Sequence, residues 1–202
     1  MEISIRARHQ FSHDQLFAMH RLRAQVFKIR KQWDVALIGD MEIDGYDALD
    51  PYYMMLENQA DVIGCWRLLP TSGPNMLADT FPELLDGTQA PADAHTWELS
   101  RFAIQGDGTL PAQLSQTTTQ AIRSLMEFGV NHSIARYVTV TTVGVERLLK
   151  RLGLDFRRMG AARTVGVEHA VALEVWVSPK TLTSLGLDHL VHLVQPAANS
   201  VH

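Results

Sequence analysis

The sequence predicts a single three-layer α/β domain, in which helices cover both faces of a central sheet. Predicted helices interleave with predicted strands along the chain, and 202 residues are the length of one ordinary domain. The composition, 46% hydrophobic and 20% charged, is typical of a globular protein with a real core. A net charge of −4 gives no indication of nucleic-acid binding. No apolar run is long enough to span a membrane.

The N-terminal segment predicts a strand followed by a long helix. Residues 2–8 alternate in polarity, as a half-buried strand does. Ser12 is a suitable N-cap for a helix that runs to about Arg30, along which apolar residues recur at helical spacing. Residues 31–50 lose this periodicity and become acidic, which predicts a long functional loop with short helical turns.

The next segment predicts a hairpin. Residues 52–58 and 61–70 are apolar runs separated by a short polar turn. A short helix is expected within residues 75–84. Residues 85–95 are rich in Gly, Pro, Asp and Ala and predict a loop.

The second half predicts further alternation of strand and helix. Residues 96–104 form an expected strand, and Pro111 is well placed in the first turn of a helix to about Asn131. Residues 136–142 are β-branched and predict a strand, and residues 144–152 predict a helix.

The C-terminal segment predicts a buried strand and an amphipathic helix. Residues 167–177 are largely apolar and precede Pro179, and residues 181–194 have helical periodicity. The single Cys65 excludes an internal disulfide and indicates a buried core thiol. With no signal-peptide core at the N-terminus, we expect a cytoplasmic protein.

Charged and aromatic residues in the first helix indicate a binding site for a small zwitterion. Arg23 and Phe27 are four residues apart and share one helix face, and Trp33 follows where the helix ends. Two aromatic rings can clasp a sulfonium or an adenine ring, and an arginine can hold a carboxylate. The alternative is an ordinary amphipathic helix with solvated arginines.

The acidic segment 40–50 has two interpretations. Asp44 and Asp47 lie in a run of carboxylates that repel one another unless a cation sits among them or water screens them. The run is therefore either a pocket for an ammonium or sulfonium group, or a solvated loop. It lacks the ligand spacing of a calcium loop, and we expect no metal site.

Two strands carry further charges that a packed core does not need. Arg67 lies in the strand CWRLLPT, and Glu98 and Ser100 alternate on the strand TWELSRF, so that both point to one face. Arg101 points to the other face unless a bulge re-aims it. Glu98 could accept a proton from an amine, although an edge strand with solvated polar residues would show the same pattern.

Taken in order, four blocks resemble the acyl-homoserine-lactone synthases, the autoinducer synthases of bacterial quorum sensing. The blocks are R-x-x-x-F-x(5)-W, E-I-D-G-Y-D, R-L-L-P-T and W-E-L-S-R-F. The order of elements also resembles the GNAT acyltransferase fold, which implies a mixed sheet with two splayed central strands that admit a thioester. The resemblance covers nearly the whole chain as one domain and is weakest over residues 105–202.

The resemblance implies an acyltransferase with two substrates and no cofactor. S-adenosylmethionine is one substrate, and the other is an acyl group on a carrier protein or on coenzyme A. The amine of S-adenosylmethionine takes the acyl group, and the carboxylate of the same molecule then closes the lactone and releases 5′-methylthioadenosine. Residues 1–50 would form the S-adenosylmethionine-binding part, and residues 96–178 the acyl-chain-binding part.

The resemblance also implies roles for individual residues. Glu98 would be the base, with Ser100 positioning the amine or a water. The zwitterion would be held by Arg23, Phe27, Trp33, Asp44, Asp47, Arg67 and Arg101. The acyl pocket would be lined by Phe102, Leu125, Met126, Thr139, Thr141, Val143 and Trp176. The hydroxyl of Thr139 could donate to a 3-oxo group. A late basic cluster, either a solvated face or a docking surface for the carrier, comprises Arg147, Lys150, Arg151, Arg157, Arg158 and Arg163.

Two alternatives remain open. A GNAT-type N-acetyltransferase using acetyl-CoA normally has a pyrophosphate-binding turn after the splayed strand, and residues 105–108 have the wrong spacing for it. A non-catalytic binding module of the same fold is disfavoured by Glu98 and the full set of ionic residues.

Overall fold

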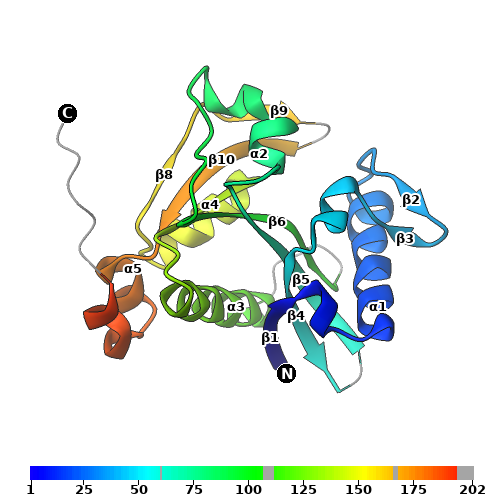
Figure 1. Ribbon diagram of the computed structural model, residues 1–202, viewed down its shortest axis with the longest axis horizontal. Coiled ribbons are helices and arrows are strands. Elements are labelled where there is room, and N and C mark those ends of the chain that lie inside the picture. Colours follow the sequence, from blue (N-terminus) through cyan, green and yellow to red (C-terminus); the bar gives the residue numbers. More distant parts are fainter. Residues whose placement is uncertain (60, 107–111, 166–167, 195–202) are drawn as a thin grey trace.

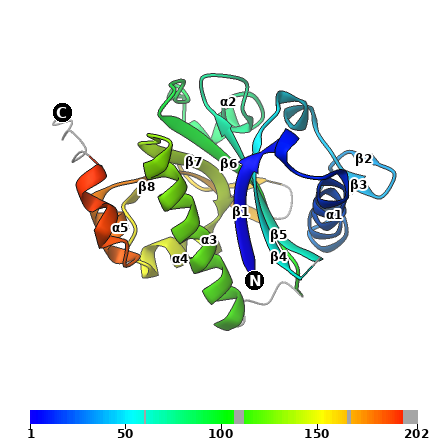
Figure 2. The same cartoon turned by 60° about the horizontal axis from the view of Figure 1, so that its bottom comes forward.

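The computed structural model describes residues 1–59, 61–106, 112–165 and 168–194. A mixed sheet forms the middle layer, with the strand order β1-β4-β5-β6-β7-β10-β8 and with β9 also pairing with β10. Helix α1 (His13–Ala24) lies on one face, and α3 (Ala112–Asn131) and α4 (Val143–Arg151) lie on the other (Figures 1 and 2). The predicted three-layer α/β architecture is therefore confirmed.

The strands of the main sheet have the following bounds: β1 Glu2–Ala7, β4 Tyr52–Asn58, β5 Asp61–Pro70, β6 Thr96–Ile104, β7 Arg136–Thr142, β8 Phe156–Arg158, β9 Arg163–Val165 and β10 Glu168–Trp176. A separate small hairpin joins β2 (Leu37–Ile38) and β3 (Met41–Glu42). The predicted strands at residues 2–8, 52–58, 61–70, 96–104, 136–142 and 167–177 are confirmed to within a residue or two at their ends. The three-residue strands β8 and β9 were not predicted.

Strands β6 and β7 are parallel neighbours that separate along their length. Their paired residues run from Thr96 with Arg136 to Leu99 with Thr139, and the pairing stops there although both strands continue. The other strand pairs of the main sheet are antiparallel. The sheet therefore opens between β6 and β7, which is the splay that the GNAT-like fold predicts.

The first helix begins at the predicted N-cap. The Ser12 hydroxyl accepts a hydrogen bond from the Gln15 backbone N–H at 3.2 Å, and the Gln15 side chain accepts one from the Ser12 N–H at 3.1 Å. After Ala24 the helix continues as a π-helix, η2 (Gln25–Arg30). A π-helical turn is a local widening that often lies at a functional site.

The remaining helical elements are short: η1 (Arg8–Gln10), η3 (Gly45–Leu49), α2 (Met76–Asp79), η4 (Pro82–Leu85), α5 (Pro179–Ser184) and η5 (Asp188–Leu193). Residues 31–50, predicted as a long loop with short helical turns, contain the short helix η3, as expected, and also β2 and β3, which were not predicted. The prediction of one helix over residues 181–194 is wrong, because Gly186 adopts φ +68° and separates α5 from η5. Pro111 lies outside the described residues.

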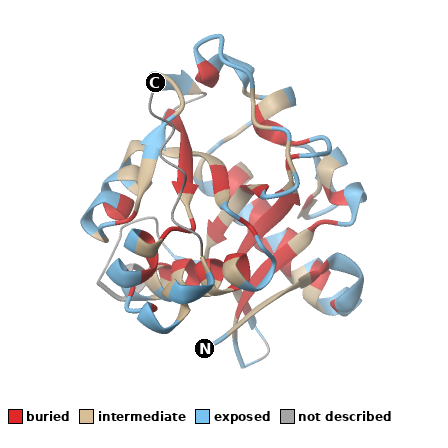
Figure 3. Cartoon of the chain, turned by 60° about the vertical axis from the view of Figure 1, so that its left-hand side comes forward, coloured by how far each residue is buried: buried red, intermediate tan, exposed pale blue. Residues whose placement is uncertain are grey.

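Buried residues concentrate on the strands and on the inner sides of the helices (Figure 3). Apolar residues of α3 and α4 pack on one face of the sheet, around Trp66 and Leu68 of β5. Apolar residues of α1 pack on the other face, around Tyr53 and Cys65. Among the described helices, none is both long and apolar enough to cross a bilayer.

Candidate active site

Six buried or half-buried side chains form a closed ring of alternating charge, which we call the charge ring. Each member forms an ion pair with the next, and the last with the first, in the order Arg23, Glu42, Arg101, Asp44, Arg67 and Asp47. The N–O distances lie between 2.5 and 3.0 Å. Three cations and three anions give the ring no net charge, which makes burial of so many ionic groups tolerable.

Asp47 is the most heavily bonded member of the ring. Its carboxylate accepts hydrogen bonds from both terminal nitrogens of Arg23 at 2.8 and 2.9 Å, and from the Tyr53 hydroxyl at 2.6 Å. Arg67 and the backbone N–H of Asp44 donate to it as well. Burial alone would raise the pKa of Asp47, but the hydrogen bonds and charges of the two arginines hold that pKa well below its usual value.

The ring is closed on one side and opens toward solvent on the other. The side chains of Arg23 and Arg67 are completely buried, whereas 11% of the Arg101 side chain and 17% of the Asp44 side chain are exposed. Met76 of α2 adds a second link, because its sulfur lies 3.1 Å from a nitrogen of Arg67 and from a nitrogen of Arg101. A ligand therefore meets one cation and one anion of the ring, Arg101 and Asp44.

A β-bulge brings Arg101 into the ring. The register between β5 and β6 shifts between Cys65 and Arg67, and Arg101 adopts φ +56°. Arg101 thereby points to the same side as Ser100, whose hydroxyl accepts a hydrogen bond from Arg67 Nε at 3.2 Å. Simple strand alternation would place Ser100 and Arg101 on opposite faces. The bulge re-aims Arg101, which is the exception that the sequence left open.

Two stacked aromatic rings lie next to the exposed side of the charge ring. Phe27 and Trp33 stack with their centroids 5.2 Å apart and their planes 20° apart. The guanidinium of Arg101 lies 5.7 Å from the Phe27 centroid. The indole Nε1 of Trp33 is buried without a hydrogen-bond partner among the described residues. Such a donor can bind an acceptor atom of a ligand.

Glu98 lies on β6 beside the ring, and only 1% of it is exposed. Its Oε2 accepts a hydrogen bond from the backbone N–H of Leu77 at 2.6 Å, whereas its Oε1 has no hydrogen-bond partner among the described residues. Burial raises the pKa of Glu98, and this effect outweighs the hydrogen bonds and the Arg67 charge that oppose it. A raised pKa brings a carboxylate closer to the value that suits a general base.

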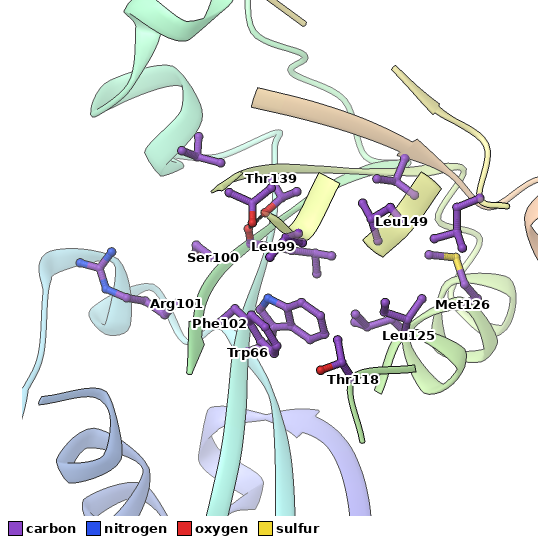
Figure 4. A pocket seen from close by; sticks show the side chains of 16 residues that line it. Trp66, Leu99, Ser100, Arg101, Phe102, Thr118, Leu125, Met126, Thr139 and Leu149 are labelled. Atoms are coloured by element: carbon purple, nitrogen blue, oxygen red, sulfur yellow. Dashed lines mark hydrogen bonds between the residues drawn. The ribbon is translucent and has the colours of Figure 1, made fainter. Parts of the chain in front are cut away.

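An apolar cavity lies on the α3 side of the sheet and reaches the splay between β6 and β7 (Figure 4). About 600 Å³ of space lies between its walls, and part of this space is open to solvent at the mouth. Its walls come from β6 and β7, from α3 and α4, and from Trp66, which stacks on Phe102 at 4.1 Å. Ser100 and Arg101 line its mouth, and the Arg101 side chain extends away from it (Figure 4). The cavity and the charge ring therefore meet at the bulge.

The structure brings five of the seven predicted acyl-pocket residues to this cavity: Phe102, Leu125, Met126, Thr139 and Thr141. Val143 and Trp176 do not line it. Val143 begins α4, two residues before Val145 and six before Leu149, which do line the cavity. Trp176 follows Val175 on β10, and successive strand residues face opposite sides, so the tryptophan contacts Arg157 instead.

The Thr139 hydroxyl already has a partner. It donates a 2.8 Å hydrogen bond to the carbonyl of Leu99, the last β6 residue paired with β7. A hydrogen bond from Thr139 to a 3-oxo group would therefore require this bond to break.

The predicted basic cluster divides into paired and unpaired residues. Arg157, Arg158 and Arg163 form ion pairs with Glu174, Glu146 and Asp86. The cations exposed on α4, by contrast, form no ion pair with described residues; they are Arg147, Lys150 and Arg151.

The sequence patterns did not single out Glu42, which is a member of the ring, or Met76, whose sulfur contacts Arg67 and Arg101. Glu42 stands within the acidic segment that suggested a cation site, so its charge was a usable signal. Met76 has no chemical signature in the sequence, because methionine is an ordinary core residue.

Comparison with known proteins identifies the family. Residues 7–184 match the family model for autoinducer synthases. An acyl-homoserine-lactone synthase of Pseudomonas aeruginosa is 50% identical over 188 residues, which cover 92% of this chain and 94% of that protein.

Solved structures agree with this match. The crystal structure of the synthase LasI has a TM-score of 0.85 and 50% identity, over 91% of this chain and 93% of that one. The synthase BjaI, described as CoA-dependent and solved with S-adenosylmethionine and isopentyl-CoA, is 25% identical, with a TM-score of 0.81 over 98% and 94% of the two chains. An acyl-CoA N-acyltransferase of Pseudomonas aeruginosa, at 10% identity and a TM-score of 0.56, shares the fold alone. The chain therefore belongs to the autoinducer synthase family, with a GNAT-like fold.

Proposed function

We propose that this autoinducer synthase makes an N-acyl-L-homoserine lactone at the bulge of β6, where the charge ring meets the apolar cavity. S-adenosylmethionine is one substrate, an acyl thioester is the other, and 5′-methylthioadenosine is released. The observation that carries the proposal is that Arg101 belongs to the ring and also lines the cavity, and that Ser100, which lines the cavity, accepts a hydrogen bond from Arg67 of the ring. A zwitterion held at the ring and an acyl chain held in the cavity would bring their reacting atoms together there.

S-adenosylmethionine fits the open side of the ring. Its ammonium or sulfonium group is a cation that the exposed carboxylate of Asp44 can hold, and its carboxylate can be held by Arg101. The rings of Phe27 and Trp33 can attract the sulfonium or stack on the adenine. In this proposal residues 1–50 supply most of the S-adenosylmethionine site, whereas Arg67 and Arg101 come from the sheet. Arg23, Glu42 and Asp47 act mainly by fixing these groups.

The acyl chain fits the cavity on the other side of the splay. Its wall is apolar apart from the hydroxyls of Thr118, Thr139 and Thr141, as an aliphatic chain requires. Beyond Leu99, β6 still pairs with β5 but no longer with β7, so N–H groups of β6 that face β7 can donate to the oxyanion of the thioester. Most of the residues that line this cavity lie within 96–178, the proposed acyl-chain-binding part.

The reaction would proceed in two steps. The α-amine attacks the thioester carbonyl, an amide forms, and the thiol leaves. Glu98 takes the proton that the amine loses, through Ser100 or a water, and the leaving thiolate regains a proton. The substrate carboxylate then attacks its own γ-carbon, the bond from that carbon to sulfur breaks, and the neutral thioether departs as 5′-methylthioadenosine. The second step needs mainly positioning, because a sulfonium is a good leaving group.

We propose an acyl carrier protein as the physiological donor. The unpaired cations of α4 support this choice, because α4 also contributes Val145 and Leu149 to the cavity wall. A partner with an acidic surface that docks on α4 would place its thioester near that wall.

Incubation of the purified protein with S-adenosylmethionine and a panel of acyl-carrier and acyl-CoA thioesters tests the function. We expect equal amounts of acyl-homoserine lactone and methylthioadenosine by mass spectrometry, with the best carrier thioester preferred to the matching CoA thioester. Folded protein that releases no methylthioadenosine with any donor would overturn the proposed function. Equal or better use of the CoA thioester would overturn only the choice of donor.

A further inference from the structure

Two consecutive cations at the C-terminal end of the π-helix, Arg30 and Lys31, make contacts that the proposed chemistry does not explain. Arg30 donates to the carbonyl of Ile104 at 3.1 Å and to the carbonyl of Gly106. Lys31 Nζ lies 2.7 and 3.0 Å from the two carboxylate oxygens of Glu168. These partners are more than 70 residues away in sequence, so the contacts are tertiary rather than local.

The two partners lie on opposite sides of the splay. Ile104 is the last residue of β6, and Glu168 is the first residue of β10. β10 is paired with β7, and its Ala170 lies opposite Thr142 at the end of β7. Since β6 and β7 stop pairing at Leu99 and Thr139, these strand ends border the open end of the sheet. Arg30 therefore holds one side of the opening, and Lys31 holds the other.

The same segment, residues 30–33, carries Trp33, and we call it the strap. Gln32 adopts φ +54° and reverses the chain, so that the Trp33 N–H donates to the Phe27 carbonyl at 2.9 Å. Lys31 Nζ lies 4.8 Å from the centroid of the Trp33 ring. Trp33 ends the strap and lies in no helix or strand, so its position depends on the contacts that Arg30 and Lys31 make.

We propose that Lys31 and Glu168 are a positioning pair, which closes the strap over the splay and thereby sets Trp33 against Phe27 for S-adenosylmethionine. The proposal rests on the proposed function, in which these two aromatic rings face that substrate. Lys31 and Glu168 act through Trp33 and touch neither reacting group.

The exposure of the pair sets the expected effect. About a quarter of each side chain is exposed, 24% for Lys31 and 26% for Glu168. A pair of this exposure contributes up to about 1 kcal/mol, which corresponds to about a five-fold change in binding. We therefore expect Lys31→Met and Glu168→Gln each to raise KM for S-adenosylmethionine about five-fold. KM for the acyl donor and kcat should change less than two-fold.

The decisive experiment is a charge swap with a matched control. The variants are Lys31→Met, Glu168→Gln and the double variant Lys31→Glu/Glu168→Lys, which restores an ion pair of opposite direction. Lys28→Met is the control, because Lys28 lies on the π-helix that precedes Lys31 but pairs at 3.6 Å with the fully exposed Asp34. Steady-state kinetics are measured for both substrates, and S-adenosylmethionine binding is measured separately by calorimetry.

We expect both single variants to bind S-adenosylmethionine more weakly, the swap to recover most of the affinity, and Lys28→Met to match the unsubstituted protein. Single variants that keep the original affinity would overturn the positioning role. So would a swap no better than the single variants while all retain the original thermal stability. If the unsubstituted protein bound S-adenosylmethionine but made no lactone, the proposed function would fail and the calorimetry would still decide on the pair.

Discussion

Replacing Asp47 by asparagine measures how much the charge ring contributes to the stability of the fold. Asn keeps the size of the side chain but removes its charge, and it leaves Arg23 and Arg67 buried with one anion too few. Removing one partner of a buried ion pair typically destabilises a protein by about 3–5 kcal/mol. Asp47 accepts five hydrogen bonds, four of them from side-chain groups, so we place the loss near the middle, at about 4 kcal/mol.

The assay is urea unfolding followed by circular dichroism, with Asp40→Asn as the control. Asp40 also pairs with an arginine of α1, but both side chains are more than half exposed, so the control should lose less than about 1 kcal/mol. For a chain of this length, a loss of about 4 kcal/mol lowers Tm by roughly 8–16 °C. If Asp47→Asn lost no more than Asp40→Asn, the ring would not be a coupled stabilising unit.

The pH dependence of stability gives an independent check on the direction of the Asp47 pKa shift. The pKa of Asp47 is lowered in the folded state, so its contribution is complete above the unfolded value of about 3.9 and is lost as the pH falls through the lower folded value. The stability difference between the unsubstituted protein and Asp47→Asn should therefore be constant near neutrality and shrink below about pH 4. A stability difference that grew in acid would contradict the lowered pKa of Asp47 in the folded state.

Three further predictions concern activity. Glu98→Gln should lower kcat about 10²-fold or more, with a smaller effect on S-adenosylmethionine binding, and near-normal turnover of the variant would make Glu98 structural. In the unsubstituted enzyme, kcat/KM should rise with pH through a value above about 4.3, because the pKa of Glu98 is raised. Reversing Lys150 and Arg151 should raise KM for the carrier thioester and flatten its salt dependence, and an unchanged KM would place docking elsewhere. Leu125→Trp should shorten the preferred acyl chain in a product profile by mass spectrometry. Thr141→Val removes a cavity hydroxyl that has no hydrogen-bond partner among the described residues, and it should lower the share of 3-oxo products if such donors are used. A product profile unchanged by both substitutions would move the acyl pocket elsewhere.

The sequence predicts the regular elements because their signals are local. Ser12 caps α1 as expected, and the alternating and apolar runs become strands near the expected bounds. The same local rules miss the π-helix at Gln25–Arg30, since nothing in its residues distinguishes it from an α-helix. They also miss β8 and β9, which are three residues long and are stabilised by pairing with β10.

The sequence predicts most of the residues that form the candidate site, but it does not predict which of them contact one another. Charge together with the family resemblance singled out Arg23, Asp44, Asp47, Arg67 and Arg101, but the order of these residues around the ring depends on tertiary packing. Arg101 is the clearest case, because a bulge decides which face it joins. The acyl pocket depends on strand phase and helix rotation, so Val143 and Trp176 were assigned to a wall that they do not reach.

The charge ring also has a consequence for how the protein folds. Its ion pairs connect residues separated by 19 to 59 positions along the chain, from α1, the β2–β3 hairpin, η3 and two central strands. No subset of these elements can complete it, and contacts of long sequence separation form late. The site is therefore complete only in molecules that have finished folding. A ligand that recognises the completed ring selects those molecules, so S-adenosylmethionine should raise the apparent stability of the chain, and the gain should grow with the logarithm of its concentration once this exceeds Kd.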